Sequence, residues 1–332
     1  MRRFRNGIQS ILFLGEFRQT DGRHKGAPCA GVWSCGERES DFRRNAQMVV
    51  TSFKNEQVRF LKSLSQKKYR EEHRVFFAEG LNVVSEGIKS GADVRKIVFS
   101  ESFASAEGFR KICGELLTPS AEGPGGPRYA QAVGKVLEEA LVLSDPVFES
   151  VSLTETPQGI GAVFGMGGAG EEECLSGNAV VVLENVQDPG NLGTVIRTAD
   201  AAGFDAVILM KGCVDAYNPK TIRSTVGSIF HIPVLRIATS SAREAFGRLQ
   251  NAGFTVYAAH PRGGHTCFEE SFEGKSAIVI GNEANGLTAE AVACCDTLLT
   301  IPMPGKAESL NASVAAALLI YEKARKSFAN VK

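Results

Sequence analysis

The sequence carries no net charge and has no hydrophobic run long enough to cross a membrane. Its 37 lysines and arginines balance its 37 aspartates and glutamates, so only a local basic surface could attract a nucleic acid. The longest apolar candidate, residues 315–320, is soon followed by Glu322 and Lys323, whereas a spanning helix needs roughly 20 apolar residues. The apolar residues 11–14 are too few for the core of a secretory signal peptide. We therefore expect no membrane partner and no signal peptide.

Paired cysteines are also lacking. The eight cysteines are spread through 332 residues without a CxxC pair, which indicates neither a zinc framework nor a disulfide scaffold. Reduced thiols are typical of the cytoplasm, and we predict that location. His260, His265 and Cys267 lie close together in the chain, but their spacing matches no standard metal site. We therefore predict that no metal is bound.

Composition divides the chain into segments. Residues 1–47 mix arginines with glycines and polar residues and show no sustained apolar period, which predicts a disordered or non-native extension. Because Met48 directly precedes the first organised segment, we expect the natural start to be there. We predict a small α/β domain over 48–165, a linker over 166–177 and a larger domain over 178–332.

The linker contains a formal GxGxxG pattern at residues 165–170. A dinucleotide site requires a helix that begins at those glycines. Here Glu171, Glu172 and Glu173 lead within a few residues to another apolar strand, so we expect no such helix. A nicotinamide-dependent oxidoreductase is therefore the weakest of the functions considered.

The 48–165 segment begins with a basic stretch. Apolar residues recur at helical spacing over 55–64 and 76–90, and residues 94–99 are typical of a short strand. Residues 54–74 carry a surplus of four positive charges, which suits contact with phosphate, although a solvated helix face explains it equally well. The candidates for phosphate contact are Arg59, Lys62, Lys67, Lys68, Arg70 and Arg74.

From residue 179 onward, strands and helices alternate. The strands are apolar throughout, which indicates burial on both faces and hence a parallel sheet with flanking helices, an α/β fold. The predicted strands are 179–183, 206–210, 234–237, 255–259, 277–281 and 298–302, and the predicted helices are 192–202, 220–230, 242–252, 288–295 and 310–326.

Polar and glycine-rich loops follow three of these strands, over 184–191, 281–286 and 302–311. Each loop ends at a predicted helix, where free backbone amides can bind an anion and glycine lets a ligand approach closely. Ligands in parallel α/β sheets bind beyond the carboxyl ends of the strands. Three such loops at one edge of a sheet predict a binding site.

Together these segments closely resemble the three signature motifs of the SpoU, or TrmH-like, branch of the SPOUT RNA methyltransferases. The first motif covers 185–203, the second 278–287 and the third 301–317. The segment that contains FFAEG at 76–80 and TPQG at 156–159 is similar to the L30e-like substrate-binding domain attached to many members. The resemblance covers nearly everything after Met48.

The resemblance implies an enzyme that transfers a methyl group from S-adenosylmethionine to a ribose 2′-hydroxyl. The attached N-terminal domain favours ribosomal RNA, with transfer RNA as the alternative, and a protein that binds structured RNA without modifying it remains a second class. The family also implies a trefoil knot in the last third of the chain and a homodimer. Sequence patterning alone would argue against a knot.

The resemblance also assigns roles to residues. It implies a cofactor pocket formed by Ile280, Gly281, Ile301, Met303, Ser309 and Leu310, although core packing also explains Ile301 and Met303. The catalytic candidates are Arg197, Asn191, Glu283, Ser309 and Asn311. Arg197 is a poor base because a guanidinium has a pKa above roughly 12, so stabilisation of a developing alkoxide or positioning of a phosphate suits it better, with base catalysis as the remaining alternative. Helix capping is the rival role for Asn191 and Asn311.

Overall fold

The computed structural model describes residues 49–105, 136–137, 139–168, 170–261 and 264–329. The predictions for residues 1–47, including a natural start at Met48, lie outside this part of the chain. Among the described residues, no helix combines the length and the apolar character that a membrane crossing requires.

The first sheet belongs to the N-terminal domain and has the strand order β1-β4-β2-β3. Strand β4 is antiparallel to β1 and β2, whereas β2 and β3 are parallel. Apolar side chains of α4 pack against one face, and those of α2 and α8 pack against the other. The elements are α2 (Glu56–Ser63), α3 (Lys67–His73), β1 (Val75–Glu79), α4 (Leu81–Lys89), β2 (Val94–Ser100), α5 (Glu101–Ser105), β3 (Leu141–Leu143), α8 (Asp145–Val151) and β4 (Ile160–Gly165).

The helix predicted over 76–90 is wrong in its first part. Every residue of β1 is buried, and the helix α4 begins only at Leu81. Gly80, with φ +106°, separates the two elements in a conformation that other residues rarely adopt. A short apolar run that is buried on both faces has no period that distinguishes a strand from a helix.

A short helix, α9 (Glu171–Ser176), follows the glycine-rich stretch. The expectation that no helix begins there is therefore wrong. The rejection of a dinucleotide site still stands, for two physical reasons. Strand β4 belongs to the mixed N-terminal sheet, so no parallel βαβ unit is formed. Three glutamates occupy the first turn of α9, where they would repel a pyrophosphate.

The second sheet has the strand order β7-β6-β5-β10-β8-β11-β9, and every described pairing in it is parallel. The predicted parallel α/β fold is confirmed. The strands are β5 (Ala179–Leu183), β6 (Ala206–Leu209), β7 (Val234–Arg236), β8 (Phe254–Ala259), β9 (His265–Thr266), β10 (Lys275–Ile280) and β11 (Thr297–Thr300). The helical elements are α10 (Pro189–Ala201), α11 (Pro219–Thr225), η1 (Ser228–Phe230), α12 (Ala242–Asn251), α13 (Ala289–Cys294) and α14 (Ala312–Ala329).

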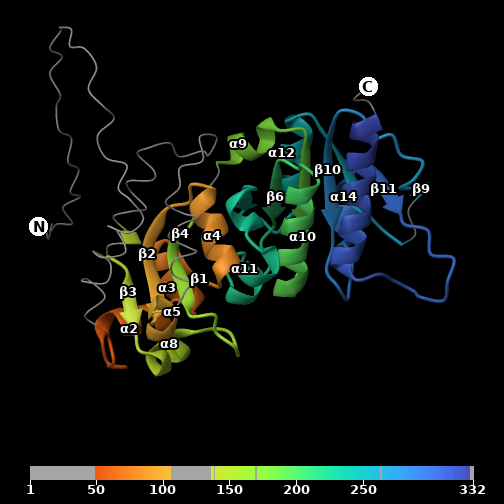
Figure 1. Cartoon of the computed structure of the whole chain (residues 1–332). Helices are drawn as coiled ribbons and strands as arrows, with labels where there is room; N and C mark the ends of the chain where they lie inside the picture. The colour runs from red at the N-terminus through yellow and green to blue at the C-terminus, as the bar shows by residue number, and fades with distance from the viewer. Residues whose placement is uncertain (1–48, 106–135, 138, 169, 262–263, 330–332) are drawn as a thin grey trace, which may run out of the picture. The chain divides into compact units, whose positions relative to one another are not determined.

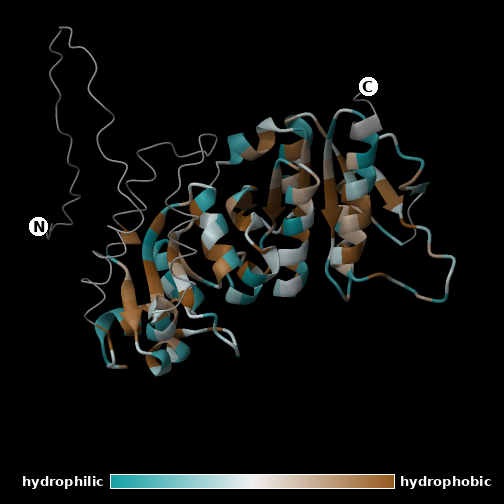
Figure 2. Cartoon of the chain, in the orientation of Figure 1, coloured by the Kyte–Doolittle hydropathy of each residue, from teal (hydrophilic) through white to brown (hydrophobic). Residues whose placement is uncertain are grey.

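Helices cover both faces of this sheet. Helices α10 and α14 lie side by side on one face, and α12 and α13 cover the other (Figure 1). Successive strand residues alternate between the two cores, as Val181 and Val182 do. Figure 2 shows that most of the strands are hydrophobic over most of their length, whereas β2 carries a hydrophilic stretch at Arg95 and Lys96. Burial on both faces accounts for the uninterrupted apolar strands in the sequence.

The strand order places the three polar loops at one edge. Strand β10 lies between β5 and β8, and β11 pairs with β8, all in parallel. The loops that follow β5, β10 and β11 therefore emerge at the same end of neighbouring strands. One predicted helix in this domain, 220–230, is interrupted because Val226 and Gly227 have φ values of 52° and 102°.

Candidate functional site

The carboxylate of Glu283 joins the loop after β10 to the loop after β5. It accepts hydrogen bonds from the backbone amides of Gln187 at 3.2 Å and Asp188 at 3.1 Å, and from Nδ2 of Asn191 at 3.1 Å. Loss of solvent around this carboxyl works to raise its pKa, but the bonds from Asn191, Asp188 and Gln187 outweigh it, and the pKa of Glu283 lies below its ordinary value. The group is therefore an anion at neutral pH that holds two loops together.

The loop after β11 joins the same network through Asn311. Its Nδ2 donates to Oδ1 of Asn191 at 3.0 Å, while its own Oδ1 accepts from the amides of Ser313 and Val314. Asn311 therefore caps α14 and also contacts the first loop, so the capping role is present, and its contact with RNA stays a prediction. Asn191 is not a cap, because the side chain of Asp188 accepts the amide of Asn191 at the start of α10.

The turn after β10 requires a glycine at position 281. A Cβ added there would lie 2.4 Å from the carbonyl carbon of Gly286. Asn282 and Gly286 exchange backbone hydrogen bonds of 3.0 and 2.9 Å across this turn, and Gly286 itself has φ +65°. The backbone thus folds tightly on itself and leaves the inner side of the loop open.

A cavity of about 300 Å³ lies between the loop after β10, the loop after β11 and residues 259–261 at the end of β8. All of the residues predicted to hold a cofactor line it together: Ile280, Gly281, Ile301, Met303, Ser309 and Leu310. Glu283 lines it as well. Apolar side chains and a tight glycine turn around a small opening suit a flat, largely apolar ligand that is recognised through backbone groups.

Glu184 is a structural residue of this site that the sequence reasoning missed. It is only 4% exposed, and its carboxylate accepts hydrogen bonds from the amide of Thr288 at 2.9 Å and from its hydroxyl at 2.7 Å. It thereby fixes the end of β5 to the helix that follows the second loop. An acidic residue directly after a buried strand was the available signal.

Arg197 differs from the other catalytic candidates. It is exposed on α10 and is not among the described residues that line the cavity. Thr194, one turn earlier on the same helix, lines an open hollow of about 670 Å³ beside α14. Residues three apart on a helix are neighbours, so Arg197 lies next to that hollow.

The basic candidates of the N-terminal domain fall into two groups. Arg59, Lys67, Lys68 and Arg74 are exposed, and Lys62 is half-buried with its Nζ 5.4 Å from the ring centre of Phe53. Arg70 is only 2% exposed and forms an ion pair with Asp215, so its proposed contact with phosphate is wrong. A buried guanidinium with a carboxylate partner is not available to RNA.

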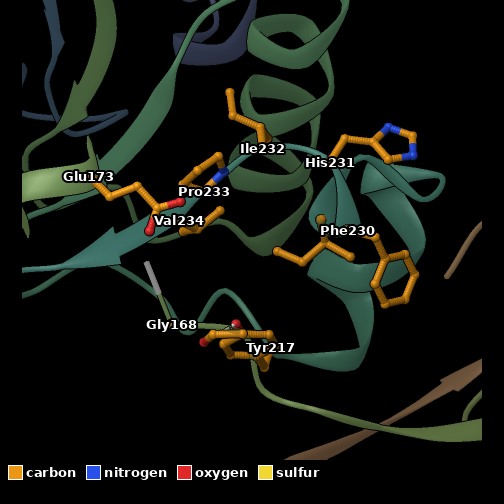
Figure 3. Close-up of a pocket in the computed structure, with 10 residues that line it drawn as sticks. Gly168, Glu173, Tyr217, Phe230, His231, Ile232, Pro233 and Val234 are labelled. Atoms are coloured by element: carbon orange, nitrogen blue, oxygen red, sulfur yellow. Dashed lines mark hydrogen bonds between the residues drawn. The ribbon is translucent and has the colours of Figure 1, made fainter. Parts of the chain in front are cut away.

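A separate cavity of about 250 Å³ is lined by Gly167, Gly168, Glu173, Tyr217 and residues 229–234 (Figure 3). The ring of His231 points away from Tyr217 and Glu173 in this view, and its nitrogens bond to Asp200 and Glu86. None of the catalytic or cofactor candidates lines this cavity.

No group of histidine, cysteine and acidic residues among the described part of the chain has the arrangement of a metal site. His260 lines the 300 Å³ cavity, whereas Cys267 is buried in the core. His260 and Cys267 are close in sequence but therefore lie in different environments.

Two family models match the chain. Residues 178–321 match the SpoU rRNA Methylase family, and residues 55–162 match the MRM3-like substrate binding domain. The 23S rRNA (guanosine(2553)-2′-O)-methyltransferase RlmP of Bacillus subtilis (strain 168) is 38% identical over 272 residues, which are 82% of this chain and 97% of that protein.

Solved structures resemble most of the chain. The AdoMet-bound rRNA methyltransferase from Sinorhizobium meliloti has a TM-score of 0.67 at 30% identity, with 84% of this chain and 97% of that chain covered. The SpoU methyltransferase AviRb from Streptomyces viridochromogenes, in complex with AdoMet, has a TM-score of 0.67 at 23% identity over 83% of this chain and 99% of that chain, which shows a shared fold.

Proposed function

The chain belongs to the SpoU rRNA methylase family, and we propose on this premise that the cavity between the loops after β10 and β11 is the site of methyl transfer. The protein is an RNA 2′-O-ribose methyltransferase that uses S-adenosylmethionine, and its substrate is ribosomal RNA. The observation that carries the assignment of the site is the junction of Asn191, Glu283 and Asn311 beside a cavity that the cofactor candidates line.

The residues present fit S-adenosylmethionine. Ile280, Ile301, Met303 and Leu310 offer apolar contact to an adenine, and the close backbone approach at Gly281 leaves amides and carbonyls to recognise its edge. When bound, this cofactor supplies a methyl group on a sulfonium. Glu283 acts as a positioning residue, because its oxygens are occupied by the amides and the side chain that it holds.

The remaining polar groups act on the RNA. Ser309 and Asn311 contact the target ribose or its phosphate, and Asn191 orients Asn311. Arg197 places a fixed positive charge near the 2′-oxygen as its proton is lost, which stabilises the developing alkoxide.

The protein forms a homodimer through the hollow between α10 and α14. Four large apolar side chains are exposed there: Phe268 51%, Val314 47%, Leu318 40% and Tyr321 50%. Exposed apolar surface of this extent favours association. Glu322 and Arg325 also line the hollow, so the surface carries both signs of charge and can complement a second copy of itself. Such a dimer brings Arg197 to the subunit interface.

The domain limits, the knot and the location follow the same reasoning. Residues 48–165 form the L30e-like RNA-binding domain, 166–177 the linker and 178–332 the methyltransferase domain, in keeping with the ranges of the two family models.

The insertion of β10 between the earlier strands β5 and β8 supports a trefoil knot in the last third. Ribosomal RNA as substrate and unpaired cysteines in the described segments support the cytoplasm.

Incubation of the purified full chain with labelled S-adenosylmethionine and with unmodified 23S rRNA or transfer RNA transcripts tests this function. We expect label in 23S rRNA, at a ribose that resists alkaline cleavage. Label in transfer RNA alone would contradict the substrate, and RNA binding without any transfer would identify a binding protein instead of an enzyme.

A further inference from the structure

Arg70 lies at the junction between helix α3 and the methyltransferase domain. Its Nη1 donates to the carbonyls of Leu64 and Ser65, each at 2.8 Å, and its Nη2 donates to Oδ2 of Asp215 at 2.5 Å. The side chains of Arg70 and Asp215 are 3% and 14% exposed. One planar guanidinium thus links the turn between α2 and α3 to a residue 145 positions later in the chain.

Asp215 belongs to a loop that is bonded to the first motif. The amide of Val214 donates to the carbonyl of Val186 at 2.9 Å, and Nε2 of Gln187 donates to the carbonyl of Gly212 at 2.7 Å. The backbone amide of Gln187 in turn donates to Glu283 at the cavity. A continuous set of hydrogen bonds therefore runs from α3 to the proposed site of methyl transfer.

Aromatic side chains hold the same two regions together. The rings of Phe76 and Tyr217 lie 4.9 Å apart, and those of Phe164 and Phe230 lie 4.7 Å apart, with one partner of each pair in each domain. Tyr217 also donates its amide to Oδ1 of Asp215 and its hydroxyl to the carbonyl of Gly167. The junction around Asp215 is therefore packed as well as hydrogen-bonded.

Stability alone is a poor explanation for this ion pair. Two charges that leave water lose solvation, and a well-packed apolar pair is often as stable. In addition, Nε of Arg70 is buried without a hydrogen-bond partner among the described residues. A buried ion pair that leaves one donor without a partner is better explained by the groups that it positions than by a gain in stability.

We propose that Arg70 is a positioning residue that fixes α3, with its exposed Lys67 and Lys68, relative to the cofactor cavity, acting through Asp215. Lys67 and Lys68 are exposed on the helix that Arg70 anchors, so RNA held by these lysines enters the cavity in one register. This inference rests on the proposed function. It predicts that Arg70 controls turnover of bound RNA and contributes little to the affinity for RNA or cofactor.

The test compares Arg70→Lys, Asp215→Asn and the double variant Arg70→Met/Asp215→Asn with wild type in the full-length chain. The double variant removes both buried charges, so it retains the fold even if a single change does not. Arg95→Met is the matched control, because Arg95 forms an exposed ion pair with Asp93 in the same domain. Lys67→Met/Lys68→Met is the comparison for loss of RNA contact.

We expect kcat on a 23S rRNA transcript to fall about tenfold or more in the three junction variants, since a small misalignment of reacting groups has effects of this size. The affinities for the transcript, measured by filter binding, and for S-adenosylmethionine, measured by calorimetry, should change by less than about twofold. The fall in kcat of the double variant should be no larger than that of Asp215→Asn. The lysine variant should instead weaken RNA binding, and Arg95→Met should match wild type. An unchanged kcat, or a parallel loss of cofactor affinity, overturns the proposal.

Hydrogen exchange supplies a readout that does not depend on activity. In the double variant, exchange at the amides of Val214 and Gln187 should become faster than in Arg95→Met, because the loop that carries them loses its anchor. Equal protection in the two proteins overturns the coupling even if the wild type proves inactive on 23S rRNA. Inactivity of the wild type with faster exchange in the double variant contradicts only the proposed function.

Discussion

The side-chain amide of Asn311 donates a hydrogen bond to the side-chain oxygen of Asn191 at 3.0 Å, although 120 positions separate the two residues in the chain. Asn311 starts the last helix and Asn191 lies in the first turn of α10. Glu283 completes the junction from a third loop through its bond to Asn191. The cavity therefore depends on contacts between parts of the chain that no local folding preference brings together.

Replacement of Glu283 by glutamine should weaken binding of S-adenosylmethionine about tenfold, which corresponds to the loss of one hydrogen bond to a charged group. The carboxylate accepts four donors, and a glutamine amide would face at least one of them with its own N–H groups. Calorimetry measures the change. Glu269→Gln, at an exposed position of the same domain, is the control and should bind the cofactor as wild type does.

Replacement of Gly281 by alanine should open the turn after β10 and reduce cofactor affinity about tenfold or more, since overpacking of a tight site has costs of this order. The new Cβ would meet the backbone of Gly286 at 2.4 Å. Gly247→Ala is the matched control. Its Cβ has no neighbour within 4 Å, and it lies inside α12, so it should raise the free energy of unfolding by about 0.5–1 kcal/mol and leave binding unchanged.

Arg197→Ala should abolish methyl transfer and leave the affinity for S-adenosylmethionine nearly intact, because Arg197 does not line the cavity. Single-turnover assays with labelled cofactor measure the transfer step. Arg243→Ala removes an exposed arginine from α12 on the opposite face of the sheet and should remain active. Persistent turnover in Arg197→Ala would remove this residue from the reaction.

Leu318→Glu should dissociate the proposed dimer, because it buries a charge in an apolar interface without a partner. Light scattering at micromolar concentration measures the mass in solution. Phe53→Glu is the control, since Phe53 is also exposed, at 51%, but lies in the N-terminal domain away from α14. A wild-type monomer, or a Leu318→Glu dimer, would be the contrary result.

His231 should make stability depend on pH. Loss of solvent lowers the pKa of its imidazole, but hydrogen bonds and attraction from Asp200 and Glu86 outweigh that effect and raise the pKa above the ordinary value. The contribution of His231 to the free energy of unfolding is then fully present below about pH 6.5, the pKa in the unfolded chain. It is lost as the pH rises through the raised pKa of the folded state. Urea unfolding should show a larger deficit for His231→Gln at acidic pH than at alkaline pH. An equal deficit at both would refute the assignment.

Much of this architecture could be predicted from local patterns. The apolar strands from residue 179 onward indicate a parallel sheet because β5, β6, β8 and β10 are buried on both faces, and the loops rich in glycine mark its ligand-binding edge. Asn191, Glu283 and Asn311 are all in the predicted loops, and the structure joins them by hydrogen bonds. Their chemical roles stay predictions until the variants above are measured.

What could not be predicted depends on partners far away in the chain. Arg70 resembles its exposed neighbours Lys67 and Lys68 in sequence, and only the distant Asp215 makes it a buried ion-pair partner. Residues 76–79 have no period that reveals a strand, because their burial comes from both helix layers of the N-terminal domain. The position of Glu184 after a buried strand is visible in the sequence, but its donor Thr288, 104 positions later, is not.

The bond between Asn191 and Asn311 also has a consequence for biosynthesis. A nascent chain whose last helix is still inside the ribosome has made most of the parallel sheet. It still lacks the contact between Asn311 and Asn191 beside the cofactor cavity. S-adenosylmethionine can then stabilise only the finished chain, by binding to the native state alone. Cofactor supply in the cell should therefore influence the lifetime of the completed protein and leave its early folding unaffected.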